Sequence, residues 1–228
     1  MRRLKTPFLI VNPKAYIYGK ESLELAKICE AFTKEYNIDI IFTAQACDLR
    51  MIRKECKNIF LTAGHMDALK PGRGMGYILP EGLKDAGIDA VVLNHAEHKL
   101  NTNTLVETLK RAKELEILTI VCADTKEECK MIANLKPDVM ILEPTSGIGT
   151  GQISDDEYIK ETTEVVRNVC KDIQIIQAAG VKSGDDVYKV LKMGADGSGG
   201  TSGILKADSP KEKIREMLEA IKRFKDER

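Results

Sequence analysis

The chain has 228 residues, of which 43% are hydrophobic, so it is long and apolar enough to bury one full core. Its 35 Lys and Arg balance its 35 Asp and Glu, which gives a formal net charge of +0 at pH 7. A chain without net charge has no long-range field that attracts nucleic acid or an anionic membrane. The composition thus excludes disordered, membrane and nucleic-acid-binding classes and leaves small molecules as the expected partners.

The N-terminal segment and the cysteines bear on where the protein works. Residues 1–16 carry basic residues and a short apolar run but no small-residue cleavage site, so we expect a first strand and not a secretory signal. The cysteines lie on apolar faces of predicted elements and form no Cys-x-x-Cys pair, which argues against a disulfide framework or a zinc site. We expect reduced thiols and a cytoplasmic protein. The six are Cys29, Cys47, Cys56, Cys122, Cys129 and Cys170.

Short apolar runs alternate with amphipathic stretches along the chain. The apolar runs predict strands at 8–12, 38–44, 58–64, 88–94, 116–122, 138–143 and 173–178. The other stretches have apolar residues three and four apart and predict helices at 22–36, near 48–55, near 80–86, and at 102–115, 125–135, 155–170, 184–193 and 209–224. Ser209 and Pro210 suit the N-cap and the first position of the last helix.

An eighth strand is required between Met193 and the last helix, where only ADGSGGTSGIL is available. Glycine and serine are poor strand formers. Eight strand-then-helix units at this spacing nevertheless favour an α/β fold with a closed (β/α)8 barrel, formed by residues 1–228 as a single domain. An open doubly wound sheet is the alternative, because the last unit is weak.

Polar residues follow several of the predicted strands, at the end of a (β/α)8 barrel where active sites lie. Asn12 and Lys14 follow the first strand, His95 and Glu97 follow the fourth, and Glu143 ends the sixth. Glu143 is a candidate general base, His95 a group that can polarise a carbonyl, and Lys14 a charge for an enolate or phosphate. Cys122 also ends a strand, but a buried structural thiol is the better interpretation.

Glycine-rich segments follow the strands near the C-terminus. At 178–180 and 197–203 the backbone is nearly bare, so its N–H groups can approach a phosphate. Pro144 favours an extended conformation at Glu143, and the glycines of 147–151 allow the next segment to close as a lid. The less specific interpretation is an ordinary strand-to-helix turn. The whole set favours enolisation of a small phosphorylated carbonyl compound.

Five motifs carry a resemblance that runs essentially end to end: VNPKAY at 11–16, LNHAEHK at 93–99, LEPTSGIGTG at 142–151, AAGVKSGDDV at 178–187 and GADGSGGTSGILKA at 194–207. The chain resembles the triosephosphate isomerase family, in its short archaeal-type branch. The resemblance implies a TIM barrel that interconverts dihydroxyacetone phosphate and glyceraldehyde 3-phosphate without cofactor or metal. It also implies a homo-oligomer, either a tetramer or a dimer.

The resemblance also implies a role for each matching residue. Glu143 would be the base that moves the proton, and His95 the neutral electrophile. Asn12 and Lys14 would bind the substrate, and Glu97 would support Lys14. Backbone amides would grip the phosphate at Gly149, Gly180, Thr201 and Ser202.

Several supporting positions depart from the family pattern, among them Ala96, Met75 and the strand-8 glycines. Gly64, Gly199 and Gly200 would leave room for a larger substrate, so an isomerase of another small sugar phosphate is the alternative function. A lyase that forms a Schiff base on Lys14 is a third hypothesis, although a lysine buried in mid-strand would suit it better. A non-catalytic phosphate-binding protein is a fourth, against which the intact Glu143 and His95 argue.

Overall fold

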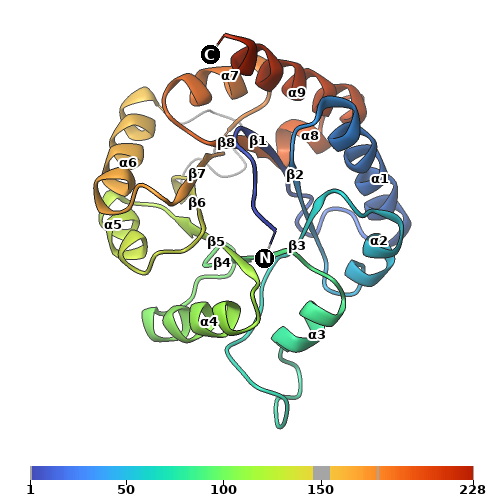
Figure 1. Ribbon diagram of the computed structural model, residues 1–228, viewed down its shortest axis with the longest axis vertical. Coiled ribbons are helices and arrows are strands. Elements are labelled where there is room, and N and C mark those ends of the chain that lie inside the picture. The colour runs from blue at the N-terminus through green and yellow to red at the C-terminus, as the bar shows by residue number, and fades with distance from the viewer. Residues whose placement is uncertain (1, 146–154, 179, 228) are drawn as a thin grey trace.

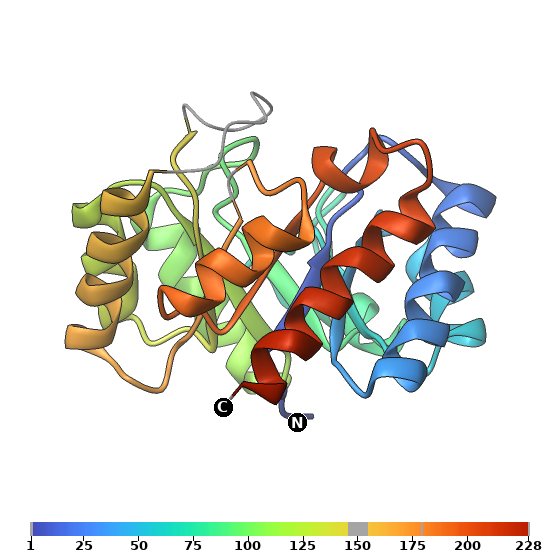
Figure 2. The same ribbon diagram turned by 90° about the horizontal axis from the view of Figure 1, so that it is seen from above.

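A computed structural model describes residues 2–145, 155–178 and 180–227. Its parallel strands form a closed barrel in chain order, in which β8 pairs with β1. The helices form a ring around the barrel (Figure 1), and the start of the chain lies at the same end of the barrel as the end of the last helix (Figure 2). The predicted (β/α)8 barrel is therefore confirmed, and the open doubly wound sheet is wrong.

The bounds of the elements follow the predicted periodicity closely. The strands are β1 (Phe8–Val11), β2 (Ile40–Ala44), β3 (Phe60–Ala63), β4 (Ala90–Leu93), β5 (Leu118–Ala123), β6 (Val139–Leu142), β7 (Gln174–Gln177) and β8 (Gly197–Gly200). The helices are α1 (Gly19–Tyr36), α2 (Leu49–Glu55), α3 (Pro80–Asp85), α4 (Thr102–Glu114), α5 (Lys126–Asn134), α6 (Asp156–Val169), α7 (Gly184–Lys192), α8 (Ser202–Leu205) and α9 (Pro210–Asp226).

Two helices differ from expectation. The first begins at Gly19 instead of residue 22, and α8 was not predicted, because four residues are too few to show a helical period. The predicted cap of α9 is present: the Ser209 side chain accepts a hydrogen bond from Glu212 N, and Pro210 is the first helical residue.

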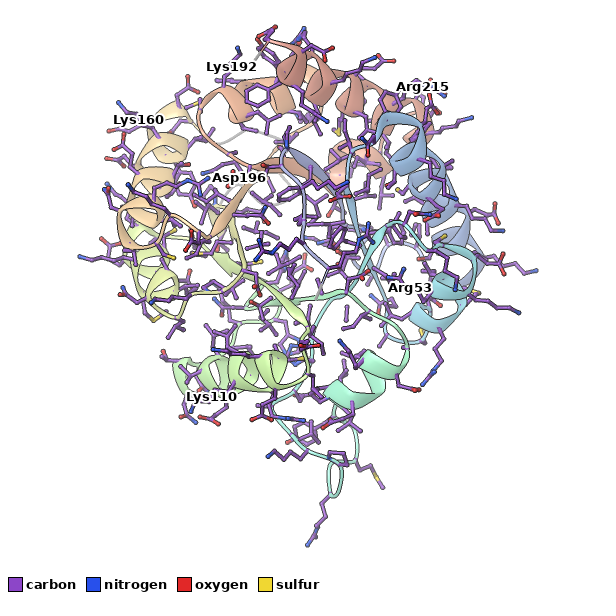
Figure 3. The ribbon with its side chains drawn as sticks, viewed as in Figure 1. Arg53, Lys110, Lys160, Lys192, Asp196 and Arg215 are labelled. Carbon is purple, nitrogen blue, oxygen red and sulfur yellow. The ribbon has the colours of Figure 1, made fainter. Side chains whose placement is uncertain are left out.

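An aspartate lies directly before each of the strands β2, β4, β6 and β8. Its carboxylate accepts a hydrogen bond from a backbone N–H of the preceding odd-numbered strand, or of the segment that leads into that strand. The pairs are Lys5 N to Asp39, Leu61 N to Asp89, Thr119 N to Asp138 and Ile175 N to Asp196, at 2.8 to 2.9 Å. Arg53 also pairs with Asp89, and Arg167 with Asp196. Figure 3 shows Asp196 inside the ring of helices, whereas Lys110 and Lys160 lie on its outer rim. These contacts fasten neighbouring strands where they begin, away from the ends that bear the candidate site.

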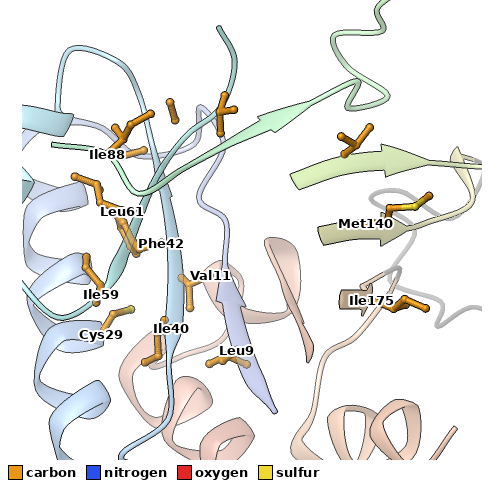
Figure 4. Packing of buried hydrophobic residues seen from close by; sticks show 14 of the residues in the cluster. Leu9, Val11, Cys29, Ile40, Phe42, Ile59, Leu61, Ile88, Met140 and Ile175 are labelled. Atoms are coloured by element: carbon orange, nitrogen blue, oxygen red, sulfur yellow. The ribbon is translucent and has the colours of Figure 1, made fainter. Parts of the chain in front are cut away.

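Buried side chains form two layers, because successive residues of a strand point to opposite faces. Leu9, Phe42 and Leu61 face outward and pack with the helices, as Figure 4 shows. Phe8, Ile10, Ile41 and Phe60 belong to the second cluster, which fills the barrel. The barrel interior is thus a packed core, and the free space lies at its mouth.

Glycine on the inner face of β8 is required by its neighbour β1. A Cβ on Gly197 would lie 2.4 Å from the Phe8 ring, and a Cβ on Gly199 would lie 2.1 Å from the backbone oxygen of Ile10. Gly199 also has a φ of +137°, which favours glycine. The expectation that Gly199 leaves room for a larger substrate is wrong, because the β1 backbone occupies that room. A Cβ on Gly64, in contrast, would have no neighbour within 4 Å.

The glycine requirement of β8 gives a test of stability. We expect Gly199→Ala to lower the free energy of unfolding by about 3 kcal/mol, since it adds overpacking to an unfavourable φ. Gly64→Ala adds the same methyl group in open space and should change stability by less than about 0.5 kcal/mol. Urea unfolding followed by circular dichroism measures both. Equal stability of the two variants would contradict the close contact between β8 and β1.

Candidate active site

The predicted site residues come together at the C-terminal mouth of the barrel. A hollow of about 230 Å³ is lined chiefly by residues that follow β1, β4, β6, β7 and β8. Its lining includes Asn12, Lys14, His95, Glu97, Glu143, Gly180, Thr201 and Ser202. A second hollow of about 340 Å³ adjoins it and shares Asn12, Lys14, His95 and Glu97. Gly149 and the rest of the predicted lid from residue 146 onward lie outside the described residues.

Lys14 is held in an unusual conformation by hydrogen bonds to its backbone. Its φ is +52°, in the left-handed region that non-glycine residues seldom occupy. Asn12 Oδ1 accepts from Lys14 N at 3.0 Å, and Gln45 Nε2 donates to Lys14 O at 2.9 Å. The Lys14 side chain is mostly buried, and its Nζ donates to Glu97 Oε1 at 2.9 Å. Two side chains thus fix the backbone of Lys14 while a third orients its ammonium group.

Glu97 is the exposed partner of this ion pair. The hydrogen bond from Lys14 holds the pKa of the Glu97 carboxyl below its ordinary value, against a smaller opposing effect of burial. Because the Lys14 amine is engaged in the pair, it is poorly placed to attack a carbonyl. The geometry gives no support to a Schiff-base lyase.

The hydrogen bond to His95 selects its neutral tautomer. Glu97 N donates to His95 Nδ1 at 3.1 Å, so Nδ1 must be an acceptor and the proton of the neutral ring lies on Nε2. Burial lowers the pKa of His95, and the Lys14 cation lowers it further. At neutral pH, His95 therefore offers an Nε2–H donor without a positive charge.

Glu143 follows β6 directly, and its backbone N donates to Ala123 O of β5 at 3.0 Å. Withdrawal from water raises the pKa of its carboxyl, Lys14 lowers it, and the carboxylates of Glu97 and Asp124 raise it. The net shift is upward. A carboxylate with a raised pKa is a stronger base than one in water.

Two residues next to the site were missed in the sequence. Gln45 comes directly after β2, where it reaches the Lys14 backbone. Asp124 comes directly after β5; its carboxylate accepts a hydrogen bond from Thr145 Oγ1, and its backbone oxygen accepts one from Tyr158. Both occupy the strand-end positions that signalled Asn12 and His95. Applying that rule to every strand would have found them.

The remaining chemistry of the described residues is limited. No group of three or more His, Cys, Asp or Glu among them is arranged to hold a metal ion, and no helix in the described ranges is long and apolar enough to cross a membrane. All six cysteines are free thiols. Cys122 is buried, and burial raises its pKa, which suits packing better than nucleophilic attack. Cys47 departs from the predicted apolar placement: it is exposed, because it lies in the loop before α2.

The fold and site together define a class of enzyme. A basic carboxylate, a neutral imidazole donor and a lysine ammonium face one small hollow at the mouth of a (β/α)8 barrel. This arrangement is typical of a barrel enzyme that moves protons on a small anionic substrate.

Comparison with known proteins makes the assignment specific. A family model described as triosephosphate isomerase matches residues 7–221. A triosephosphate isomerase of Sulfolobus acidocaldarius is 35% identical over 225 residues, covering 96% of this chain and 97% of that protein. One from Methanocaldococcus jannaschii is 35% identical over 218 residues, with 93% and 99% covered, and one from Metallosphaera sedula is 34% identical over 230 residues, with 99% and 100% covered. The chain belongs to the triosephosphate isomerase family and is an aldose–ketose isomerase.

The tautomer of His95 is directly measurable. Its pKa is lowered from an ordinary value of about 6.5, so at pH 7 the ring should be neutral and should gain its proton only below that pH. ¹⁵N NMR of labelled imidazoles should then show a protonated Nε2 and a bare Nδ1, with the signal assigned by its loss in His95→Gln. An imidazolium signal at pH 7, or a proton on Nδ1, would contradict the hydrogen-bond assignment.

Proposed function

We propose that Glu143, His95 and Lys14 carry out the interconversion of dihydroxyacetone phosphate and glyceraldehyde 3-phosphate in this chain. The observation that best supports these roles is the meeting of Glu143 and the neutral His95 in one hollow, although they follow different strands. Enolisation requires a base for a carbon-bound proton and a donor for the oxygen that becomes negative. The two side chains supply both.

The reaction then proceeds by transfer of one proton in two steps. Glu143 removes a proton from the carbon next to the carbonyl, and the electron pair of that C–H bond moves toward the carbonyl oxygen. His95 Nε2–H donates to this oxygen as its charge grows. Glu143 returns the proton to the neighbouring carbon of the enediol, and a proton moves between the two oxygens, so that aldose and ketose interconvert without net change in atoms or electrons.

The other residues bind the substrate. Lys14 and Asn12 contact it, and Lys14 balances the developing negative charge while Glu97 holds the ammonium group in place. The phosphate is bound by backbone N–H groups of Gly149, Gly180, Thr201 and Ser202. The segment 144–151 closes over the site as a lid and excludes water, and no cofactor or metal takes part.

The same proposal covers the domain organisation, the cellular location and the oligomeric state. We propose that the chain forms a single domain and works in the cytoplasm as a homo-oligomer, a dimer or a tetramer. The segment between β3 and α3 projects beyond the ring of helices (Figure 1) and exposes Met75 and Tyr77. A second copy that covers these side chains would remove apolar surface from water.

The position of the base is tested by shortening it. Glu143→Asp withdraws the carboxylate by one methylene, and we expect turnover to fall about a hundredfold or more, since proton transfer from carbon tolerates little displacement. The assay couples glyceraldehyde 3-phosphate isomerisation to the reduction of dihydroxyacetone phosphate. The urea unfolding midpoint should match that of the parent. Activity within a fewfold of the parent would remove Glu143 from the role of base.

The role of His95 is tested by separating turnover from binding. His95→Gln replaces the imidazole by a neutral amide, and we expect turnover to fall about a hundredfold while the affinity for glycerol 3-phosphate changes much less. The reason is that the donor serves the transition-state oxyanion more than the ground state. Equal losses of turnover and affinity would mean that His95 only binds substrate.

A further inference from the structure

The loop that carries His95 and Glu97 is fastened at both ends by one side chain. Asn94, which directly follows β4, is buried and has a φ of +59°. Its Oδ1 accepts from Leu100 N at 3.0 Å, and its Nδ2 donates to Cys122 O of β5 at 3.0 Å. Asn94 therefore ties the beginning of the loop to its end and ties both to the neighbouring strand.

A carboxylate on the helix α5 completes this arrangement. Glu128, in the first turn of α5, accepts from Asn94 Nδ2 at 2.9 Å and from Asp124 N at 2.7 Å. Both of its oxygens also accept from Lys99 Nζ, at 2.9 and 3.1 Å. A carboxylate at a helix N-terminus is also stabilised by the helix dipole. Glu128 thus joins the loop after β4 to the loop after β5.

The joined loops hold groups that the chemistry depends on. The bond from Glu97 N to His95 Nδ1 lies within the loop whose ends are fixed by Asn94 and Lys99. The Glu97 N–H that points at Nδ1 favours Nδ1 as the acceptor, whereas Glu97 Oε2, 3.9 Å from Nδ1, would favour a proton there, so a change in loop shape that moves the N–H away lets Nδ1 take the ring proton. The Glu128 carboxylate bonds to Asn94, Lys99 and Asp124 and not to His95 or Glu97 among the described residues, so its connection to them runs through the loop.

We propose that Glu128, acting through Asn94 and Lys99, is a positioning residue that holds His95 as the Nε2–H tautomer directed into the site. This inference rests on the proposed role of His95 as the electrophile. It assigns to α5, which contributes no residue to the hollow, the task of fixing the geometry of one half of the reaction.

The central test is Glu128→Gln. The amide has one oxygen, so a donor that now meets a carboxylate oxygen will meet an NH2 group instead, and Lys99 loses its counter-charge. We expect kcat to fall about tenfold with KM within about twofold, because a misdirected donor affects the transition state most. At pH 7 the ¹⁵N spectrum of His95 should no longer be that of the pure Nε2–H form.

The matched control is Glu127→Gln. Glu127 is the preceding residue of α5, is exposed, and its side chain makes no hydrogen bond to the described residues. The change removes the same charge from the same helix end and should leave both kcat and the His95 spectrum as in the parent. A second variant, Lys99→Met, removes the exposed partner of Glu128 and also a cation that lowers the pKa of His95, so the tautomers are compared at a pH at which both rings are neutral. Both kcat and the tautomer should then shift in the same direction as in Glu128→Gln, but by less.

The outcomes separate the two proposals. A parent-like kcat and a parent-like His95 spectrum in folded Glu128→Gln would overturn the positioning role, as would an equal loss of kcat in Glu127→Gln without a change in tautomer. If Glu128→Gln does not fold, an unchanged spectrum in Lys99→Met overturns it. The spectrum needs no substrate. A shifted tautomer therefore supports the positioning role even if the parent fails to isomerise triose phosphates, in which case only the proposed function fails.

Discussion

The absence of side chains on the inner face of β8 is the constraint on which the barrel and its site depend. The Phe8 ring and the Ile10 backbone occupy the space beside Gly197 and Gly199, so the last strand approaches the first closely enough to close the sheet. The same pairing continues one step further, where Asn12 N donates to Gly200 O at 3.2 Å. Closure therefore brings Thr201 and Ser202 beside the end of the first strand, where Asn12 and Lys14 line the same hollow.

The two ends of the barrel use hydrogen bonds for different purposes. At the beginning of the strands, aspartates bond to neighbouring strands, and Asn37, Glu116 and Lys136 close by have left-handed backbone. At the other end, Lys14 and Asn94 have left-handed backbone; the Asn12 side chain accepts from Lys14 N, and the Asn94 side chain accepts from Leu100 N. Left-handed backbone therefore occurs at both ends of the barrel, and such strain persists only when nearby contacts hold it, as the two asparagine side chains do at the site end. The packed interior and the aspartate contacts stabilise the barrel that holds these strand ends in place.

The sequence predicted what local patterns encode. Alternating periods located the seven clear strands, and the rule that active sites lie at strand ends brought Asn12, His95 and Glu143 into one set before any geometry was known. The sequence could not show that the space beside Gly199 is filled, since that depends on how closely β1, far away in the chain, approaches β8. The pairing of Asn94 with Glu128 was hidden for the same reason: the two are 34 positions apart and on different elements. Contacts between loops have no period to reveal them.

The charges of the site have conflicting effects that its geometry resolves. Lys14 lowers the pKa of both His95 and Glu143; the first effect keeps the imidazole neutral, whereas the second weakens the base. Glu97 pairs directly with Lys14 and opposes its effect on Glu143. Glu97 also raises the pKa of His95, but burial of the ring and Lys14 outweigh it. Because burial disfavours the charged form of both groups, it moves the two pKa values toward each other, and both shifts persist beside the Lys14 cation, which is paired with Glu97.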